Sequence, residues 1–162
     1  MTIFGPHHDI HTLVDLLRWR ARYCARQLAY VFVTEGVETA RMTYEDLDRW
    51  SRAIGGFLQS LGETGSRVLL LYPPGLDYIA AFLGCLYAGA VAIPSYPPRL
   101  NRPDARLQGI VNDSQAGIAL TLPSILTGVE RRFEHTPELA AVRCSRELAL
   151  NIAKPCSEQS FT

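Results

Sequence analysis

A loop stiffened by proline, from Pro94 to Pro103, carries the side chains with the clearest chemical potential in this sequence. Four prolines in ten residues exclude a regular helix or strand there, and Tyr96 and Arg99 lie among them. A guanidinium group in a stiff loop can hold a phosphate or a carboxylate through paired hydrogen bonds. Tyr96 and Arg99 are therefore our candidate substrate-binding residues. The simpler alternative for Arg99 is a side chain in solvent or paired with Asp104.

Other reactive residue types are few. Lys154 is the only lysine among the sixteen basic residues, so chemistry that needs an amine must use it or take place elsewhere. The four cysteines form no C-x-x-C pair, which favours buried reduced thiols. The histidines near the start have no Cys, Asp or Glu at a recognisable ligand spacing. We predict no metal site and no catalytic residue.

Glycine-rich and carboxylate-rich motifs are equally uninformative. The sequence contains no G-x-x-x-x-G-K-[ST], no G-x-G-x-x-G and no G-x-S-x-G. The carboxylates Glu45, Asp46 and Asp48 lie at a predicted helix start, where they interact favourably with the helix dipole. We expect these carboxylates to face solvent.

The scaffold of the candidate loop is predicted by the stretch from 67 to 98. Residues 67–72 form an apolar run typical of a strand buried on both faces, and 76–88 predict a buried helix that ends at Gly89. Residues 90–93 predict a second buried strand, ended by Pro94. Two such strands joined by a helix imply a parallel pair with a right-handed crossover. Open α/β sheets bind ligands at the carboxyl ends of their strands, which is where this loop begins.

The remaining sequence extends the same pattern. The further predicted elements are a helix from about 13 to 24 with Thr12 and Asp15 at its cap, an antiparallel hairpin of 28–33 and 37–42, a helix capped by Thr43 and ended by Gly62, a helix opened by Pro103, a strand at 117–121, a helix from Pro123 to about Phe133, and a strand at 139–142. This alternation predicts an α/β fold with a partial doubly wound, mainly parallel sheet, flanking helices and one N-terminal hairpin. We expect residues 1–143 to form one domain and 144–162 a divergent, poorly tied tail.

Charge and hydropathy exclude some partners and locations. The formal net charge of the 162 residues is zero, which does not favour nucleic acid as a partner. The most apolar segment is interrupted by Pro73, Pro74, Gly75 and Asp77, so we predict no membrane span. The first residues show no basic start and no apolar block of a signal peptide. We therefore expect a cytoplasmic protein.

The block LLLYPPGLDYIAAFLGCLYAGAVAIPSYPPR, residues 69–99, strongly resembles the amino-terminal part of fatty acyl-AMP ligases. The segments Met42-Thr-Tyr-Glu-Asp-Leu and Ile110-Val-Asn-Asp-Ser-Gln-Ala resemble the same enzymes, which belong to the adenylate-forming superfamily. The resemblance covers residues from about 9 to 143. It implies an incomplete N-terminal domain of the adenylate-forming fold.

The resemblance also implies a reaction. Enzymes of this family condense a fatty acid with ATP, assisted by Mg²⁺, to acyl-AMP and pyrophosphate. The acyl group then passes to the phosphopantetheine thiol of an acyl carrier protein, in lipid or polyketide biosynthesis. The partners implied for this chain are thus a fatty acid and a carrier protein.

Parts of the family's machinery have no counterpart in these residues. The Ser/Thr/Gly-rich phosphate loop ending in Pro-Lys, the ribose-binding aspartate motif and the carboxy-terminal domain with its catalytic lysine are absent, and nothing around Lys154 matches that lysine. We expect roughly the first quarter of such an enzyme, whether from a premature stop, a frameshift or a gene fragment. It should be inactive alone, bind ATP and Mg²⁺ poorly and associate through an exposed sheet edge. The alternative is a stand-alone, non-catalytic binding or interaction module.

Overall fold

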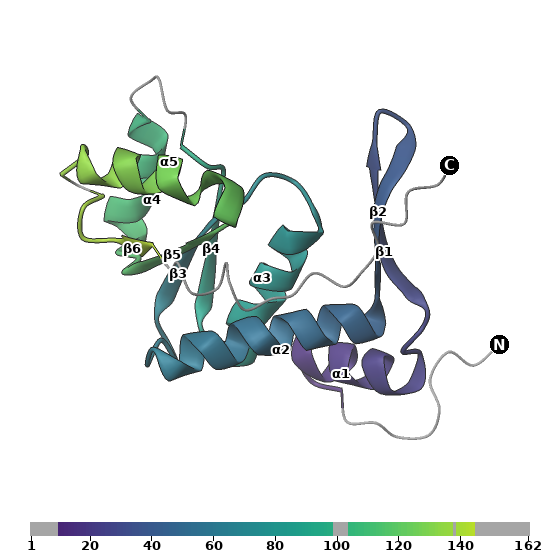
Figure 1. Ribbon diagram of the computed structural model, residues 1–162. Coiled ribbons are helices and arrows are strands. Elements are labelled where there is room, and N and C mark those ends of the chain that lie inside the picture. The colour runs from purple at the N-terminus through teal and green to yellow at the C-terminus, as the bar shows by residue number, and fades with distance from the viewer. Residues whose placement is uncertain (1–9, 99–103, 138, 145–162) are drawn as a thin grey trace.

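A computed structural model of the chain describes residues 10–98, 104–137 and 139–144. Helices and strands alternate along these residues (Figure 1). The helices are α1 (Leu13–Tyr23), α2 (Tyr44–Ser60), α3 (Leu76–Ala88), α4 (Ala105–Ser114) and α5 (Pro123–Glu134). The strands are β1 (Leu28–Thr34), β2 (Val37–Thr43), β3 (Arg67–Leu71), β4 (Val91–Ser95), β5 (Ile118–Thr121) and β6 (Arg143–Cys144). No helix within the described ranges has both the length and the apolar character needed to cross a lipid bilayer.

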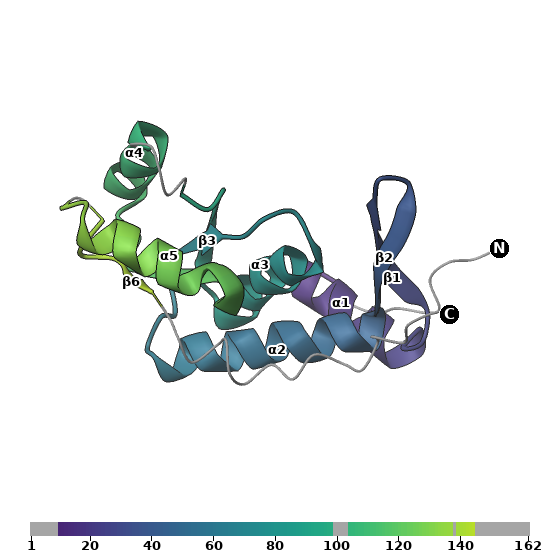
Figure 2. The same cartoon turned by 45° about the horizontal axis from the view of Figure 1, so that its top comes forward.

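The central element is a parallel sheet with the strand order β4-β3-β5-β6. Helix α3 carries the chain from β3 to β4, whose register places Val68 opposite Ala92 and Leu69 opposite Ile93. Helices α2 and α3 lie on one side of the sheet, and α4 and α5 lie on the other (Figures 1 and 2). The predicted parallel pair joined by a helix and the predicted doubly wound α/β fold are therefore confirmed. The antiparallel hairpin β1–β2 forms a separate two-stranded sheet, also as predicted.

Strand β3 joins two hydrophobic clusters. Val68 and Leu70 belong to a cluster with α1, α2 and α3, whereas Leu69 and Leu71 belong to one with α4 and α5. All four side chains have 0% exposure. Since successive side chains of a strand point to opposite faces, a continuous apolar run fits a strand covered on both sides. Burying each such side chain contributes about 1.5–3 kcal/mol, so β3 anchors the elements around it.

The predicted helix caps are present. Thr12 accepts a hydrogen bond from the backbone of Asp15 at 3.0 Å, and Thr43 accepts one from the backbone of Asp46 at 3.2 Å. Both aspartates reach back to the capping residue, which completes a capping box at each helix. Gly89 ends α3 with φ +70°, a conformation that favours glycine.

Two strand predictions were wrong. We expected a buried strand at 90–93 that ends at Pro94, but β4 continues through Pro94 to Ser95 and Val91 is 52% exposed. The reason is that β4 is the outermost strand of the sheet. At such an edge, the amide proton that proline lacks would have no hydrogen-bonding partner in a neighbouring strand. We also expected a strand at 139–142, but the sixth strand is Arg143–Cys144. Leu139 and Val142 are buried within a turn, closed by a bond from the Val142 amide to the Leu139 carbonyl at 3.0 Å.

The expectation for the carboxylates was wrong for Asp48. Its side chain is buried between α2 and α3, accepts a hydrogen bond from the Tyr87 hydroxyl and lies 3.3 Å from Arg52. Burial first, and then the bond to Asp48, raises the pKa of Tyr87. Arg18 of α1 stacks over the Tyr87 ring at 5.0 Å, so this polar network links all three helices of one layer.

Candidate functional site

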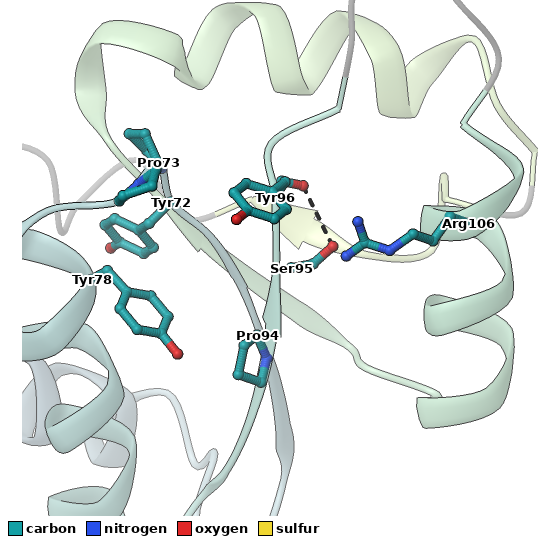
Figure 3. A pocket seen from close by; sticks show the side chains of 8 residues that line it. Tyr72, Pro73, Tyr78, Pro94, Ser95, Tyr96 and Arg106 are labelled. Atoms are coloured by element: carbon teal, nitrogen blue, oxygen red, sulfur yellow. Dashed lines mark hydrogen bonds between the residues drawn. The ribbon is translucent and has the colours of Figure 1, made fainter.

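A cavity of about 320 Å³ opens at the carboxyl ends of β3 and β4. Its lining consists mainly of tyrosine rings and prolines, with one guanidinium group. Figure 3 shows the labelled side chains converging on it from the strand ends, α3 and α4. The lining residues are Tyr72, Pro73, Pro74, Tyr78, Pro94, Ser95, Tyr96 and Arg106.

The topology of the sheet accounts for the position of this cavity. The chain leaves β3 for β4 on one side and later returns to β5 on the other side of β3. In open α/β sheets, ligands bind at the carboxyl edge near such a reversal of strand order. Tyr72 directly follows β3, and Ser95 is the last residue of β4. Both therefore lie at the edge where a ligand site is expected.

Two tyrosines form the inner wall. Tyr72 is only 6% exposed, and burial, followed by the nearby Asp77 and Cys85, raises the pKa of its hydroxyl well above the usual value. Tyr78 lies in the first turn of α3, with its ring centroid 6.3 Å from that of Phe82. The inner wall thus offers aromatic ring surfaces, and the raised pKa keeps the Tyr72 hydroxyl protonated at physiological pH.

Arg106 supplies the positive charge of the lining. It lies in the first turn of α4, where Asp104 caps the helix by accepting a hydrogen bond from the Leu107 amide at 3.0 Å. The Arg106 guanidinium stacks over the ring of Tyr96, 5.8 Å from the centroid. Tyr96 itself is 62% exposed, so the pair stands at the mouth of the cavity (Figure 3).

The two candidate residues of the sequence analysis have different outcomes. Tyr96 lines the cavity, although its role in binding substrate stays a prediction. Arg99 lies outside the described residues. Sequence reasoning missed Tyr72, Tyr78 and Arg106. Tyr72 had a usable signal, because it stands between the end of a buried strand and a Pro-Pro turn. Arg106 had one too, because it lies in the first turn of the helix after the candidate loop.

The described lining suits two kinds of chemical group. Tyrosine rings and prolines suit an apolar or flat group, and the guanidinium suits a carboxylate or phosphate. Among the described residues that line the cavity there is no carboxylate, histidine, cysteine or lysine, the side chains that most often transfer a proton near neutral pH. Within the described ranges, no three His, Cys, Asp or Glu side chains form a group that could hold a metal ion.

Cys85, behind Tyr72 on α3, should resist alkylation in the folded protein. Burial raises the pKa of its thiol from 9.0 to about 12. Because only the thiolate reacts, its fraction at pH 8 falls on the order of a thousand-fold, and steric exclusion slows the reaction further. We expect iodoacetamide to modify Cys24, which is partly exposed, well before Cys85, as measured by peptide mass spectrometry.

Unfolding in urea should remove that difference between the two thiols. Equal labelling of Cys85 and Cys24 without denaturant would contradict the buried position of Cys85.

Comparison with known proteins adds to this geometry. The family model described as AMP-binding enzyme matches residues 17–159. A medium-chain-fatty-acid–[acyl-carrier-protein] ligase of Moorena producens is 46% identical over 117 residues, which cover 70% of this chain and 20% of the ligase. Disco-interacting protein 2 of Drosophila melanogaster is 33% identical over 126 residues, 74% of this chain and 7% of that protein. The chain therefore spans a fifth or less of the length of these relatives.

A solved structure shares the fold. The fatty acyl-adenylate ligase of L. pneumophila, crystallised with acyl adenylate and pyrophosphate, superposes with a TM-score of 0.72 at 38% sequence identity. The match covers 85% of this chain and 23% of the ligase. The fold described above is thus similar to that of part of this enzyme.

Proposed function

Because the chain belongs to the AMP-binding enzyme family, we propose that it forms part of a ligase that activates a fatty acid with ATP, producing acyl-AMP and pyrophosphate. The observation that carries this proposal is the 46% identity with a medium-chain-fatty-acid–[acyl-carrier-protein] ligase. A structural neighbour holding both acyl adenylate and pyrophosphate supports the same reaction. By analogy, the acceptor of the activated acyl group is the thiol of a carrier protein in the cytoplasm, within lipid or polyketide biosynthesis.

We assign the cavity a part in holding the substrates. The Arg106 guanidinium can bind an acidic group of the fatty acid or nucleotide, while Tyr96 and Tyr78 contact an apolar portion. Arg99, three residues after Tyr96 in the sequence, stays our second candidate cation. Adenylation by the family uses ATP with Mg²⁺, and a bound Mg²⁺ would supply positive charge to the phosphates. The lining residues that the structure describes include no carboxylate and therefore do not fit a Mg²⁺ site.

These 162 residues, in our proposal, do not complete the reaction alone. They span about a fifth of the matched ligase, and no motif for cradling ATP phosphates occurs in them. Positive groups that stabilise the charge developing at the α-phosphorus must therefore come from other residues. The family fold would extend beyond the boundary at 143 that we expected, because Cys144 belongs to β6 and the family model matches as far as residue 159.

The test is fatty-acid-dependent ATP–pyrophosphate exchange with decanoate as the acid. The full chain alone should give no exchange above the enzyme-free background. The Moorena producens ligase, with its matched region replaced by this chain, should retain exchange. In that chimera, the double substitution Tyr96→Leu and Arg106→Gln should raise the KM for decanoate or for ATP by about ten-fold. A ten-fold change corresponds to the loss of a charge-assisted contact of about 1.4 kcal/mol.

A matched control is Arg67→Gln, an exposed arginine at the start of β3, at the opposite end of the strand from the cavity. It should leave KM unchanged. Exchange by the isolated chain would refute the proposed inactivity. A folded chimera without exchange would refute the proposed function.

A non-catalytic binding module is the second candidate. It is favoured by the 33% identity with Disco-interacting protein 2, whose name describes an interaction and not a reaction. This candidate predicts that the isolated chain binds decanoate or a carrier protein in calorimetric titration without consuming ATP. Lack of binding by the well-folded chain would leave the ligase part as the better description.

A further inference from the structure

Helix α1 and the turn that follows it present three arginines to solvent. The segment 13–26 holds four arginines and a single carboxylate, that of Asp15. Arg18, Arg22 and Arg26 are exposed, and none of the ion pairs between described residues includes them. None of the three lines the cavity at the strand ends. Their charge is therefore free to meet a partner from outside the chain.

Stability accounts for only part of this positive charge. Arg20 is half-buried, and its guanidinium carbon stacks 5.4 Å from the ring centroid of Trp19 and 5.5 Å from that of Tyr44. Cations in the last turn of a helix also interact favourably with its dipole, which applies to Arg20 and Arg22. Arg26 lies beyond the last residue of α1. The exposed charge thus extends further than the helix itself requires.

Exposed ring and apolar surface accompany the arginines. Tyr23 is 55% exposed, and its ring centroid lies 5.6 Å from the guanidinium carbon of Arg22 and 5.6 Å from the ring centroid of Trp19. Leu28, the first residue of β1, is 49% exposed and follows Arg26 closely in the sequence. Helix α1 lies beside the base of the hairpin, at the end of the molecule away from the four-stranded sheet (Figures 1 and 2). We define the α1 surface as Arg18, Arg22, Tyr23, Arg26 and Leu28.

Charge and shape favour an anionic lipid surface as the occupant. Guanidinium groups bind phosphates, and exposed tyrosine and leucine side chains enter the boundary between lipid headgroups and acyl chains. The inner face of α1 is not available for insertion, because Leu17 is 5% exposed within the main hydrophobic cluster. Binding is therefore shallow. A folded protein partner needs a larger apolar area to bury than two separate side chains provide.

Nearby carboxylates limit this attraction. The Asp15 carboxylate is held in the capping box with Thr12 at the start of α1. Glu45 lies next to the turn that carries Arg26, because its amide donates to the Ala25 carbonyl at 3.1 Å. Glu45 is exposed and forms no ion pair with another described residue. Its negative charge should repel an anionic surface, so its removal should strengthen binding.

We propose that the α1 surface attaches the chain reversibly to membranes that contain anionic phospholipid. The arginines bind headgroup phosphates, while Tyr23 and Leu28 enter the boundary with the acyl chains. Fatty acids partition into membranes through their apolar tails, so attachment brings part of a fatty-acid ligase close to its substrate. That benefit rests on the proposed function, whereas the attachment itself does not. Failure to bind membranes would leave the expected ATP–pyrophosphate exchange of the chimera unchanged.

The test is flotation of the full 162-residue chain with unilamellar vesicles, which separates bound protein from aggregates. Vesicles of equal parts phosphatidylglycerol and phosphatidylcholine should carry the chain upward, vesicles of phosphatidylcholine alone should not, and high salt should release it. The double substitution Arg22→Gln and Arg26→Gln should lower the partition coefficient by about ten-fold or more. Tyr23→Ser should lower it without a change of charge, and Glu45→Gln should raise it.

The matched control is the pair Arg67→Gln and Arg131→Gln, which removes the same charge from exposed positions in β3 and α5. It should leave the partition coefficient nearly unchanged, and circular dichroism should show that every variant keeps the parent fold. No flotation with the anionic vesicles, or an equal loss of binding in both arginine pairs, would overturn the proposal. Binding to immobilised polyglutamate but not to vesicles, lost in the Arg22 and Arg26 variant, would also overturn it, in favour of an acidic protein as occupant.

Discussion

Replacing Leu70 with alanine is expected to lower the free energy of unfolding by about 2–5 kcal/mol. Leu70 has 0% exposure in the middle of β3, with Pro94 opposite on β4 and Leu120 opposite on β5. The substitution removes buried apolar atoms and leaves a cavity that neighbours held in two strands cannot fill. Since a domain of this size has a stability of about 5–15 kcal/mol, one substitution removes a large share of it. Urea denaturation followed by circular dichroism measures the change.

The same substitution, leucine to alanine, at an exposed site is the control that separates the effect of burial from the effect of the residue change itself. Leu13→Ala, where the parent side chain is 57% exposed, should change stability by no more than about 0.5 kcal/mol. Similar small losses for both variants would show that β3 is not enclosed by helices on both faces. The fold described above would then be wrong at its centre.

The elements best predicted from the sequence are those whose burial or ends can be inferred from their own residues. An apolar run that fits burial on both faces identified β3, and small residues with a closing glycine identified α3 to its last residue. Thr12 and Thr43 marked helix starts through local hydrogen bonds that need no tertiary context. Each of these signals depends on neighbours in sequence.

The failures depend on neighbours in space. The run at 90–93 looks the same in a central strand and in an edge strand, because only the strand order decides which amides need partners. Asp48 resembles a solvated carboxylate until α3 places Tyr87 against it. The cavity contains residues of both kinds: one predicted from its neighbours in sequence and one placed there by neighbours in space. Tyr96 was found because it follows a strand, but Tyr78 comes from a helix that only the crossover brings to the same edge.

Replacing Gly84 with alanine should destabilise the chain by about 1–3 kcal/mol, although alanine is the better helix former. Gly84 lies in α3 where α2 crosses it. A Cβ atom there would lie 2.5 Å from Cγ2 and 2.6 Å from Cβ of Ile54, and 3.2 Å from the Ser51 carbonyl oxygen. A rotamer change of Ile54 cannot relieve a clash with its Cβ, because that atom is fixed to the backbone. The two helices must therefore separate, and the polar contact between Asp48 and Tyr87 should weaken with them.

Gly56→Ala, in the same pair of helices, should change stability in the opposite direction from Gly84→Ala. Gly56 is in the interior of α2, and a Cβ there meets no atom within 4 Å. Without a clash, alanine should stabilise by about 0.5–1 kcal/mol, because glycine loses more backbone entropy on folding. The sign of the effect thus reports the spacing of α2 and α3 directly, in two urea titrations. Stabilisation by both substitutions would mean that the helices do not approach at Gly84, which would also remove the basis for burying Asp48 between them.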